Sequence, residues 1–116
     1  MRAVIYHTPA CGTSRKVLAR LKEAGLEPET INYLKTPPDA KTLKTLLKSM
    51  GKTVRDILRK KGTPYAELGL DDPAVGDEAI FAAIAAHPVL IERPIVVVDG
   101  RAALCRPPEV VETLLT

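Results

Sequence analysis

Residues 7–16, HTPACGTSRK, bring together the residue types that carry out thiol chemistry. At their centre is Cys11, one of the chain's 2 cysteines, with His7 before it as a donor or cation. The thiolate is the nucleophile, and an ordinary thiol with a pKa of about 8.5 is mostly protonated at neutral pH. Free backbone N–H groups at the start of a helix favour an anion and lower that pKa. Cys11 is therefore either a reactive thiol or a small packing residue at the end of a strand.

The residues that follow the cysteine suit a reactive thiol. They are Gly12, Thr13, Ser14 and Arg15, which offer a close-wrapping backbone, two hydroxyl donors and a positive charge. Ser14 stands where a Cys-x-x-Cys pair has its second cysteine, so the loop cannot resolve an oxidised Cys11 by itself. Cys105, in the run AALCRPP, fits a buried strand better than a resolving role. Instead of supporting the thiol, His7 could be a packing or surface residue, and Arg15 could be a solvated residue of the first helical turn.

Two arginines share a local feature, because Arg93 precedes Pro94 and Arg106 precedes Pro107. A residue before proline is held in an extended backbone conformation, which helps to place its side chain. The guanidinium group stays charged and offers a fork of donors that matches tetrahedral oxyanions. Arg59, in the run LRKK, is a third candidate. The three form an anion site only if the fold brings them together; singly, each is as well explained as a surface residue.

The elements that position these residues can be predicted from hydrophobic periodicity and turn signals. A strand at Arg2–Tyr6, a helix from about Ser14 to Ala24 and a strand at Pro28–Tyr33 form a βαβ unit with parallel strands. Helices follow: the first is capped by Thr36 and ended by Gly51, a short one is capped by Thr53, and a third, from Glu78 to Ala86, is capped by Asp77.

The C-terminal part changes to strands. Pro94–Val98 is rich in β-branched residues, Asp99-Gly100 is a strong hairpin signal, and Ala102–Cys105 is the returning strand. A last helix begins at Pro107. We therefore predict an α/β fold with βαβ, a central helical insertion at about 37–87, and then ββα, giving a four-stranded mixed sheet in a single domain over residues 1–116.

The composition excludes several classes of protein. The chain has 116 residues and a net charge of +3, and no apolar run approaches the roughly 18 residues of a membrane helix. No signal peptide is recognisable, so we expect a cytoplasmic protein without a membrane partner. Two cysteines are too few for a disulfide framework or a Cys-based zinc site. Nine Lys or Arg lie between Lys35 and Lys61, but without aromatic residues they indicate a solvated face or the steering of a small anion rather than nucleic-acid binding.

Four motifs together resemble one known family. They are HTPACGTSR, VRDILRKKGTPYAELGL, HPVLIERPIVV and LCRPPEVV, and in this order they resemble the bacterial arsenate reductases of the glutaredoxin-coupled ArsC type across nearly the whole chain. The resemblance implies a thioredoxin-like fold and a cis peptide bond between Arg93 and Pro94.

The resemblance also implies a mechanism. Cys11 is the nucleophile that forms a covalent thioarsenate, and His7 supports its thiolate. Arg59, Arg93 and Arg106 bind the oxyanion and stabilise developing charge. Glutathione, a co-substrate rather than a bound cofactor, attacks the adduct, glutaredoxin reduces the mixed disulfide, and arsenite leaves. No metal takes part.

Two other functions remain open at this level. One is a monothiol oxidoreductase of the glutaredoxin type, which would act on glutathione mixed disulfides without needing Arg59 or Arg106. The other is a non-enzymatic regulator that binds RNA polymerase, like the Spx proteins of the same fold. Those carry a Cys-x-x-Cys switch, and Ser14 argues against one here.

Overall fold

The computed structural model describes residues 2–116 and divides the chain into two compact units. The first comprises the residues up to Thr36 together with Arg93–Thr116, and the second is Pro37–Glu92. The predicted helical insertion falls inside the second unit, which runs a few residues further, to Glu92. The grouping of both units into a single domain stays a prediction. No helix within the described residues is long and apolar enough to span a membrane.

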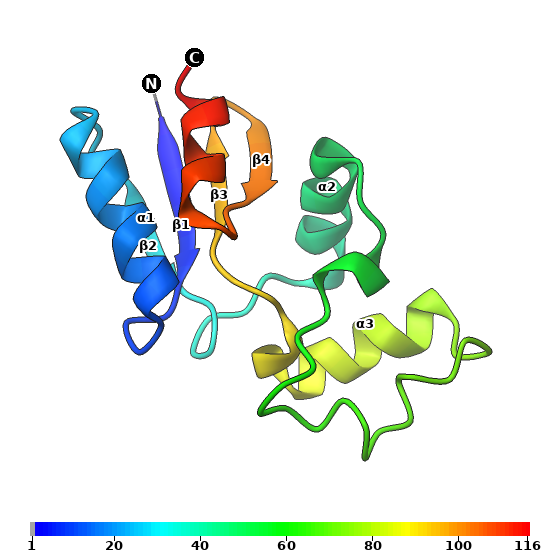
Figure 1. Ribbon diagram of the computed structural model, residues 1–116. Coiled ribbons are helices and arrows are strands. Elements are labelled where there is room, and N and C mark those ends of the chain that lie inside the picture. Colours follow the sequence, from blue (N-terminus) through cyan, green and yellow to red (C-terminus); the bar gives the residue numbers. More distant parts are fainter. Residues whose placement is uncertain (1) are drawn as a thin grey trace. The chain divides into compact units, whose positions relative to one another are not determined.

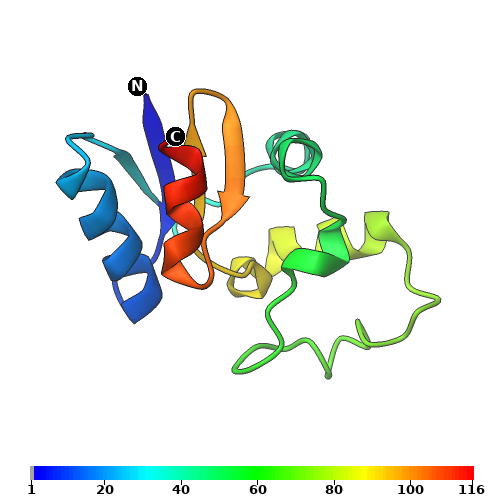
Figure 2. The same ribbon diagram turned by 45° about the horizontal axis from the view of Figure 1, so that its top comes forward.

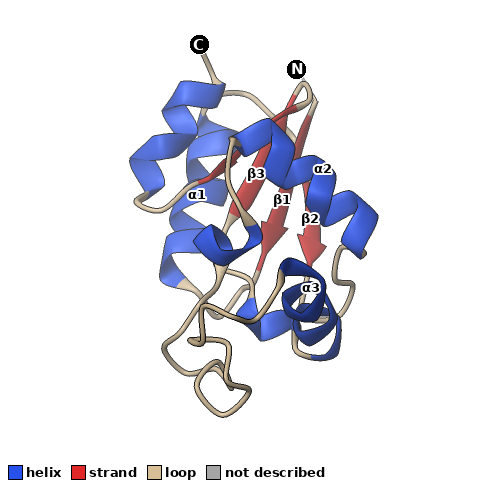
Figure 3. Ribbon diagram, turned by 90° about the vertical axis from the view of Figure 1, so that its right-hand side faces the viewer, coloured by secondary structure: helices blue, strands red, loops and turns tan. Residues whose placement is uncertain are grey.

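The first unit is built on a four-stranded mixed sheet, which confirms the predicted α/β class. Its strands are β1 (Ala3–His7), β2 (Glu29–Asn32), β3 (Ile95–Val98) and β4 (Arg101–Leu104). The order is β2-β1-β3-β4, with β1 and β2 parallel and the other two pairs antiparallel. Figure 3 shows the arrows of β1 and β2 pointing the same way.

One face of this sheet is covered by two helices, α1 (Gly12–Glu23) and the 3₁₀ helix η3 (Pro108–Leu114). Figures 1 and 2 show them side by side, α1 in blue and η3 in red. Arg20 of α1 pairs with Glu112 of η3 at 3.1 Å. The hydrophobic core between sheet and helices consists of Ala3, Ile5, Val17, Leu21, Leu26, Val96, Val98, Cys105, Val111 and Leu114. Burial of this aliphatic surface is the main stabilising contribution in the first unit.

The β3–β4 hairpin follows from its two turn residues. Asp99 has a φ of 49° and Gly100 a φ of 83°. A two-residue turn of this kind needs a positive φ at both positions, which Gly accepts freely and Asp tolerates better than most residues. The Asp-Gly prediction is therefore confirmed.

The strand directions gather several chain segments at one edge of the sheet. Tyr6 of β1 pairs with Ile31 of β2 and with Ile95 of β3, and Ile95 pairs with Leu104 of β4. Strands β1 and β2 therefore end where β3 begins and β4 ends. The segments that continue from this edge hold Cys11, Tyr33, Arg93 and Arg106.

The second unit contains α2 (Ala40–Met50), α3 (Asp77–Ala86) and the short 3₁₀ helices η1 (Val54–Ile57) and η2 (Pro88–Leu90). Two predicted helix starts are wrong. The N-cap of α2 is Asp39, whose carboxylate accepts a hydrogen bond from the Thr42 N–H at 2.8 Å, because Thr36 lies too far upstream to reach the first turn. The N-cap of α3 is Gly76, and Asp77 lies inside the first turn, where its charge faces the positive end of the helix dipole.

One arginine of the basic segment organises the loop before α3. The Arg55 guanidinium donates to the carbonyls of Leu70 at 2.9 Å, Asp72 at 2.9 Å and Val75 at 2.7 Å. These carbonyls lie in a stretch without regular secondary structure, so the three hydrogen bonds from Arg55 fix the path of the backbone there. Arg55 is therefore a structural residue rather than part of a solvated face.

We expect Arg55→Ala to destabilise the protein by about 2–3 kcal/mol, because three carbonyls lose a charged donor. Denaturant unfolding measures this loss, and hydrogen exchange locates it in residues 65–76. Lys61→Ala removes the same charge from an exposed position and serves as the control, with an expected change within about 0.5 kcal/mol. Equal effects of the two substitutions would contradict the structural role.

Candidate active site

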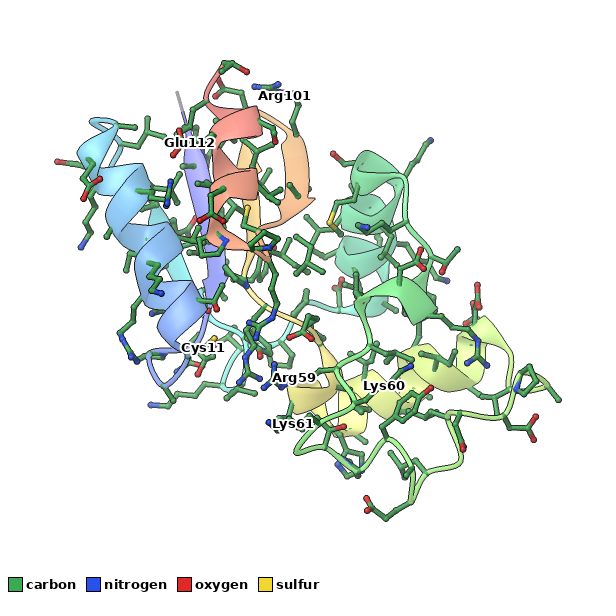
Figure 4. All side chains as sticks on the ribbon, in the orientation of Figure 1. Cys11, Arg59, Lys60, Lys61, Arg101 and Glu112 are labelled. Atoms are coloured by element: carbon green, nitrogen blue, oxygen red, sulfur yellow. The ribbon has the colours of Figure 1, made fainter. Side chains whose placement is uncertain are left out.

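Cys11 is the N-cap residue of α1, because the helix begins at Gly12 and not at the predicted Ser14. The cysteine therefore lies directly at the end of the helix. Its backbone is extended, with φ −94° and ψ 121°. Its N–H donates to the Thr8 carbonyl at 3.1 Å, and its own carbonyl accepts from the Arg15 N–H at 3.1 Å. Figure 4 shows Cys11 at the N-terminal end of α1. No acidic residue stands in the first turn, and the Ser14 N–H of that turn acts on the sulfur.

Two of the three predicted arginines meet this sulfur. The Arg106 Nη1 lies 3.8 Å from the Cys11 Sγ and 3.3 Å from the Arg93 carbonyl oxygen, to which it also donates. The Arg93 side chain hydrogen-bonds the Cys11 thiolate, and its Nη1 donates to the Tyr33 hydroxyl at 3.4 Å. Residues more than 80 positions apart in the chain are thereby joined by the sheet topology. Arg93 and Arg106 thus meet at the sulfur, while the binding of an anion by them stays a prediction.

The surroundings of Cys11 favour the thiolate. Burial alone raises the pKa of the thiol, whose residue is only 8% exposed. The Ser14 N–H, the Arg93 side chain, the Ser14 hydroxyl and the Arg106 side chain together outweigh burial and lower the pKa to about 6. The Ser14 hydroxyl is buried and, among the described residues, has no other hydrogen-bond partner. At neutral pH Cys11 is therefore mostly ionised.

His7 lies at the end of β1 and is buried. Burial lowers its pKa, and the charge of Arg15 lowers it further. The imidazole is therefore neutral at neutral pH. The sequence left two roles open for His7, a hydrogen-bond donor or a cation, and the cation is excluded. Its Nδ1 is buried without a hydrogen-bond partner. A role of His7 in supporting the thiolate stays a prediction, and it is one that a neutral ring must perform.

The rest of the cysteine loop is held by its own side chains. The Arg15 Nη1 donates to the Pro9 carbonyl at 2.6 Å, so this hydrogen bond links the start of α1 to the loop before Cys11. Thr13 is half-buried. A Cβ added at Gly12 would meet the Arg15 guanidinium at 3.7 Å, an ordinary contact, so neither the backbone nor the packing requires glycine there.

The two arginine–proline segments are joined to each other. The Arg93–Pro94 peptide is cis, as the resemblance implied, and the Arg106–Pro107 peptide is cis as well. The Cys105 N–H donates to the Pro94 carbonyl at 2.9 Å. This bond ties the start of β3 to the end of β4, and so fixes the backbones that carry both arginines.

Cys105 is fully buried in the core of the first unit, which confirms its predicted burial, although β4 ends one residue before it, at Leu104. Burial raises the pKa of its thiol to about 12. A protonated thiol without access to solvent is unreactive. The pKa values of the two thiols thus differ by about six, and only Cys11 is a candidate nucleophile.

Arg59 belongs to the second unit, where Glu92 holds it. Its Nη1 lies 2.8 Å from the Glu92 Oε1, and both side chains are about one-fifth exposed. The adjacent backbones pair through a bridge between Leu58 and Ile91. A part for Arg59 in binding an anion stays a prediction.

Sequence reasoning missed Tyr33 as a residue of this site. Tyr33 is fully buried, and its hydroxyl accepts a hydrogen bond from Arg93. Its position directly after β2, at the edge where β1 also ends, is the signal that could have drawn attention to it.

A sheet of order β2-β1-β3-β4 with an ionised cysteine at the start of its first helix defines a thiol protein of the thioredoxin-like fold. Its family follows from the sequence: the chain belongs to the ArsC family, whose model matches residues 6–114.

Individual relatives agree with this assignment. The chain is 50% identical over 115 residues to an arsenate reductase of Rhizobium meliloti, covering 99% of this chain and 82% of that one. It is 45% identical over 112 residues to an arsenate reductase of Neisseria meningitidis, covering 96% of each. The structure of an arsenate reductase from Vibrio cholerae superposes with a TM-score of 0.93 at 48% identity, covering 98% of each chain. The resemblance drawn from the four motifs is confirmed.

We expect the alkylation rate of Cys11 to rise with pH around a midpoint of about 6, because the thiolate is the reacting form. Iodoacetamide labelling followed by mass spectrometry at a series of pH values measures it. Cys105 should stay unlabelled in the folded protein and react only after denaturation. A midpoint at the free-cysteine value of about 8.5 would contradict an activated thiolate.

Proposed function

We propose that the protein is an arsenate reductase that uses glutathione and glutaredoxin as its source of electrons. The observation that supports this most strongly is the ionised Cys11 sulfur in contact with the side chains of Arg93 and Arg106. The relatives from Rhizobium meliloti and Neisseria meningitidis carry the same activity in their names.

The first step forms a bond without changing any oxidation state. The Cys11 sulfur attacks arsenic, an S–As bond forms, and one arsenate oxygen leaves as water after taking up protons. Because both the thiolate and arsenate are anions, their approach is opposed by charge repulsion. Arg93 and Arg106 offset this repulsion and stabilise the charge that develops on the remaining oxygens. Arg59 is the third member of the set that we propose for the oxyanion.

The second step transfers two electrons. A glutathione thiolate attacks the Cys11 sulfur, an S–S bond forms, and the S–As bond breaks with its electron pair going to arsenic. Arsenic is thereby reduced from the +5 to the +3 state and leaves as arsenite. Glutaredoxin then reduces the mixed disulfide and restores Cys11.

External thiols are needed because the chain offers no resolving thiol of its own. Ser14 takes the place of a nearby second cysteine, and Cys105 is buried and protonated. Glutathione therefore acts as a co-substrate, and no bound cofactor is required for this chemistry. A glutathione-rich compartment, the cytoplasm, is the location that we propose.

The alternative of a monothiol glutaredoxin-like oxidoreductase uses the same thiolate. It is less favoured because a mixed disulfide of glutathione does not require two guanidinium groups at the sulfur. The alternative of an RNA polymerase-binding regulator draws no support from the site, where the reactive cysteine has no partner cysteine in its loop.

We expect Cys11→Ser to abolish arsenate reduction in a coupled assay with glutathione, glutaredoxin, glutathione reductase and NADPH. Arg93→Ala and Arg106→Ala should each lower kcat/KM by about tenfold to a hundredfold, because each removes a charged donor. Cys105→Ala is the matched control and should keep its activity, since that thiol is unreactive. Full activity in Cys11→Ser would contradict the mechanism.

The activity that depends on the Cys11 thiolate should fall as the pH is lowered through about 6. The pKa of Cys11 is below the ordinary value, so the thiolate is present above this pH and is lost below it. Initial rates between pH 5 and 8 at constant ionic strength measure the dependence. If Arg106 helps to lower the pKa of Cys11, the pH profile of Arg106→Ala should be displaced to higher pH. A profile identical to that of the unchanged protein would contradict this role of Arg106.

A further inference from the structure

Tyr33 is fully buried at this edge of the sheet, and its hydroxyl contacts an arginine of the site. It follows β2 directly, and the last β2 residue, Asn32, pairs with His7 at the end of β1. Its ring is therefore anchored beside the segment that leads to Cys11. A buried phenol hydroxyl is costly without a hydrogen-bond partner, so the partner it has is a fixed feature of the structure.

That partner is Arg93, whose Nη1 donates to the Tyr33 hydroxyl at 3.4 Å. An arginine side chain loses considerable rotamer freedom when it is held in one conformation. The hydrogen bonds of Arg93 to the Cys11 sulfur and to Tyr33 both favour its charged, ordered state. A guanidinium fixed by a buried hydroxyl is thus already ordered before any anion arrives, which lowers the cost of binding one.

The two arginines are positioned by different means. The Arg106 Nη1 is held by the Arg93 carbonyl at 3.3 Å, and so by the backbone. The Arg93 guanidinium, in contrast, has the Tyr33 hydroxyl as its partner on the side of β2. Loss of that hydroxyl should therefore act on Arg93 first, and on the sulfur only through Arg93.

We propose that Tyr33 is a positioning residue for the reaction proposed above: its buried hydroxyl holds the Arg93 guanidinium beside the Cys11 sulfur and in place for the incoming oxyanion. The inference rests on the proposed function for the oxyanion, but the placement of Arg93 beside the sulfur stands independently of it. Tyr33 does not touch the reacting atoms, and its effect passes through Arg93.

The test is Tyr33→Phe, which removes one oxygen and keeps the packing of the ring. We expect the pH midpoint of Cys11 alkylation to move upward and the KM for arsenate to rise about threefold to tenfold, the range for one lost hydrogen bond. Tyr65→Phe removes the same group from a half-buried ring of the second unit that contacts the Lys60 ammonium, and should leave both quantities unchanged. An unchanged midpoint and KM in Tyr33→Phe, with or without a lower melting temperature, would overturn the proposal.

A double-mutant cycle separates positioning from general stabilisation. In an Arg93→Ala background, Tyr33→Phe should have no further effect on the alkylation midpoint, because the residue through which it acts is gone. Additive effects of the two substitutions would overturn the proposal. A shifted midpoint in a protein that does not reduce arsenate would contradict the proposed function but support the role of Tyr33, since alkylation needs no arsenate.

Discussion

A negatively charged sulfur at the edge of a small sheet is the feature on which the chemistry of this protein depends. Burial works against it, because desolvation of Cys11 favours the neutral thiol. The charge persists because donors reach the sulfur from two directions: Ser14 on the first turn of α1, and two arginines from the opposite end of the chain. Without these donors Cys11 would resemble Cys105, whose burial without compensation raises its pKa to about 12.

The topology of the sheet makes this meeting possible. A parallel pair, β1 and β2, ends where the antiparallel β3 begins and β4 ends. Four chain segments therefore converge at one edge, and each contributes one side chain: the nucleophile, the hydroxyl of Tyr33 and the two guanidinium groups. The same arrangement leaves the nucleophile without a resolving thiol. Two guanidinium groups beside a single reactive sulfur suit arsenate as substrate and a separate thiol as reductant.

Much of this was predictable from local sequence, and the remainder depended on long-range packing. Three signals are local and each predicts one structure: Asp99-Gly100 predicts a hairpin turn, Gly51 a helix end, and the arginine–proline pairs a fixed backbone. The cap of α2 was misassigned because Thr36 and Asp39 are both good caps and only the helix position decides between them. The neutral state of His7 depends on its burial, and the contacts of Arg55 with Leu70 and of Tyr33 with Arg93 join residues 15 and 60 positions apart. No local pattern encodes such contacts.

The most direct test of the central claim is intact-mass analysis of the protein after incubation with arsenate and glutathione in the absence of glutaredoxin. A glutathione mixed disulfide should form on Cys11 only when both compounds are present, because the S–As bond must form before glutathione can displace arsenite. Peptide mapping should place the modification on Cys11, with Cys105 unmodified. Mixed disulfide formation that is the same with glutathione alone, or no modification with both compounds, would contradict arsenate reduction by the Cys11 thiolate.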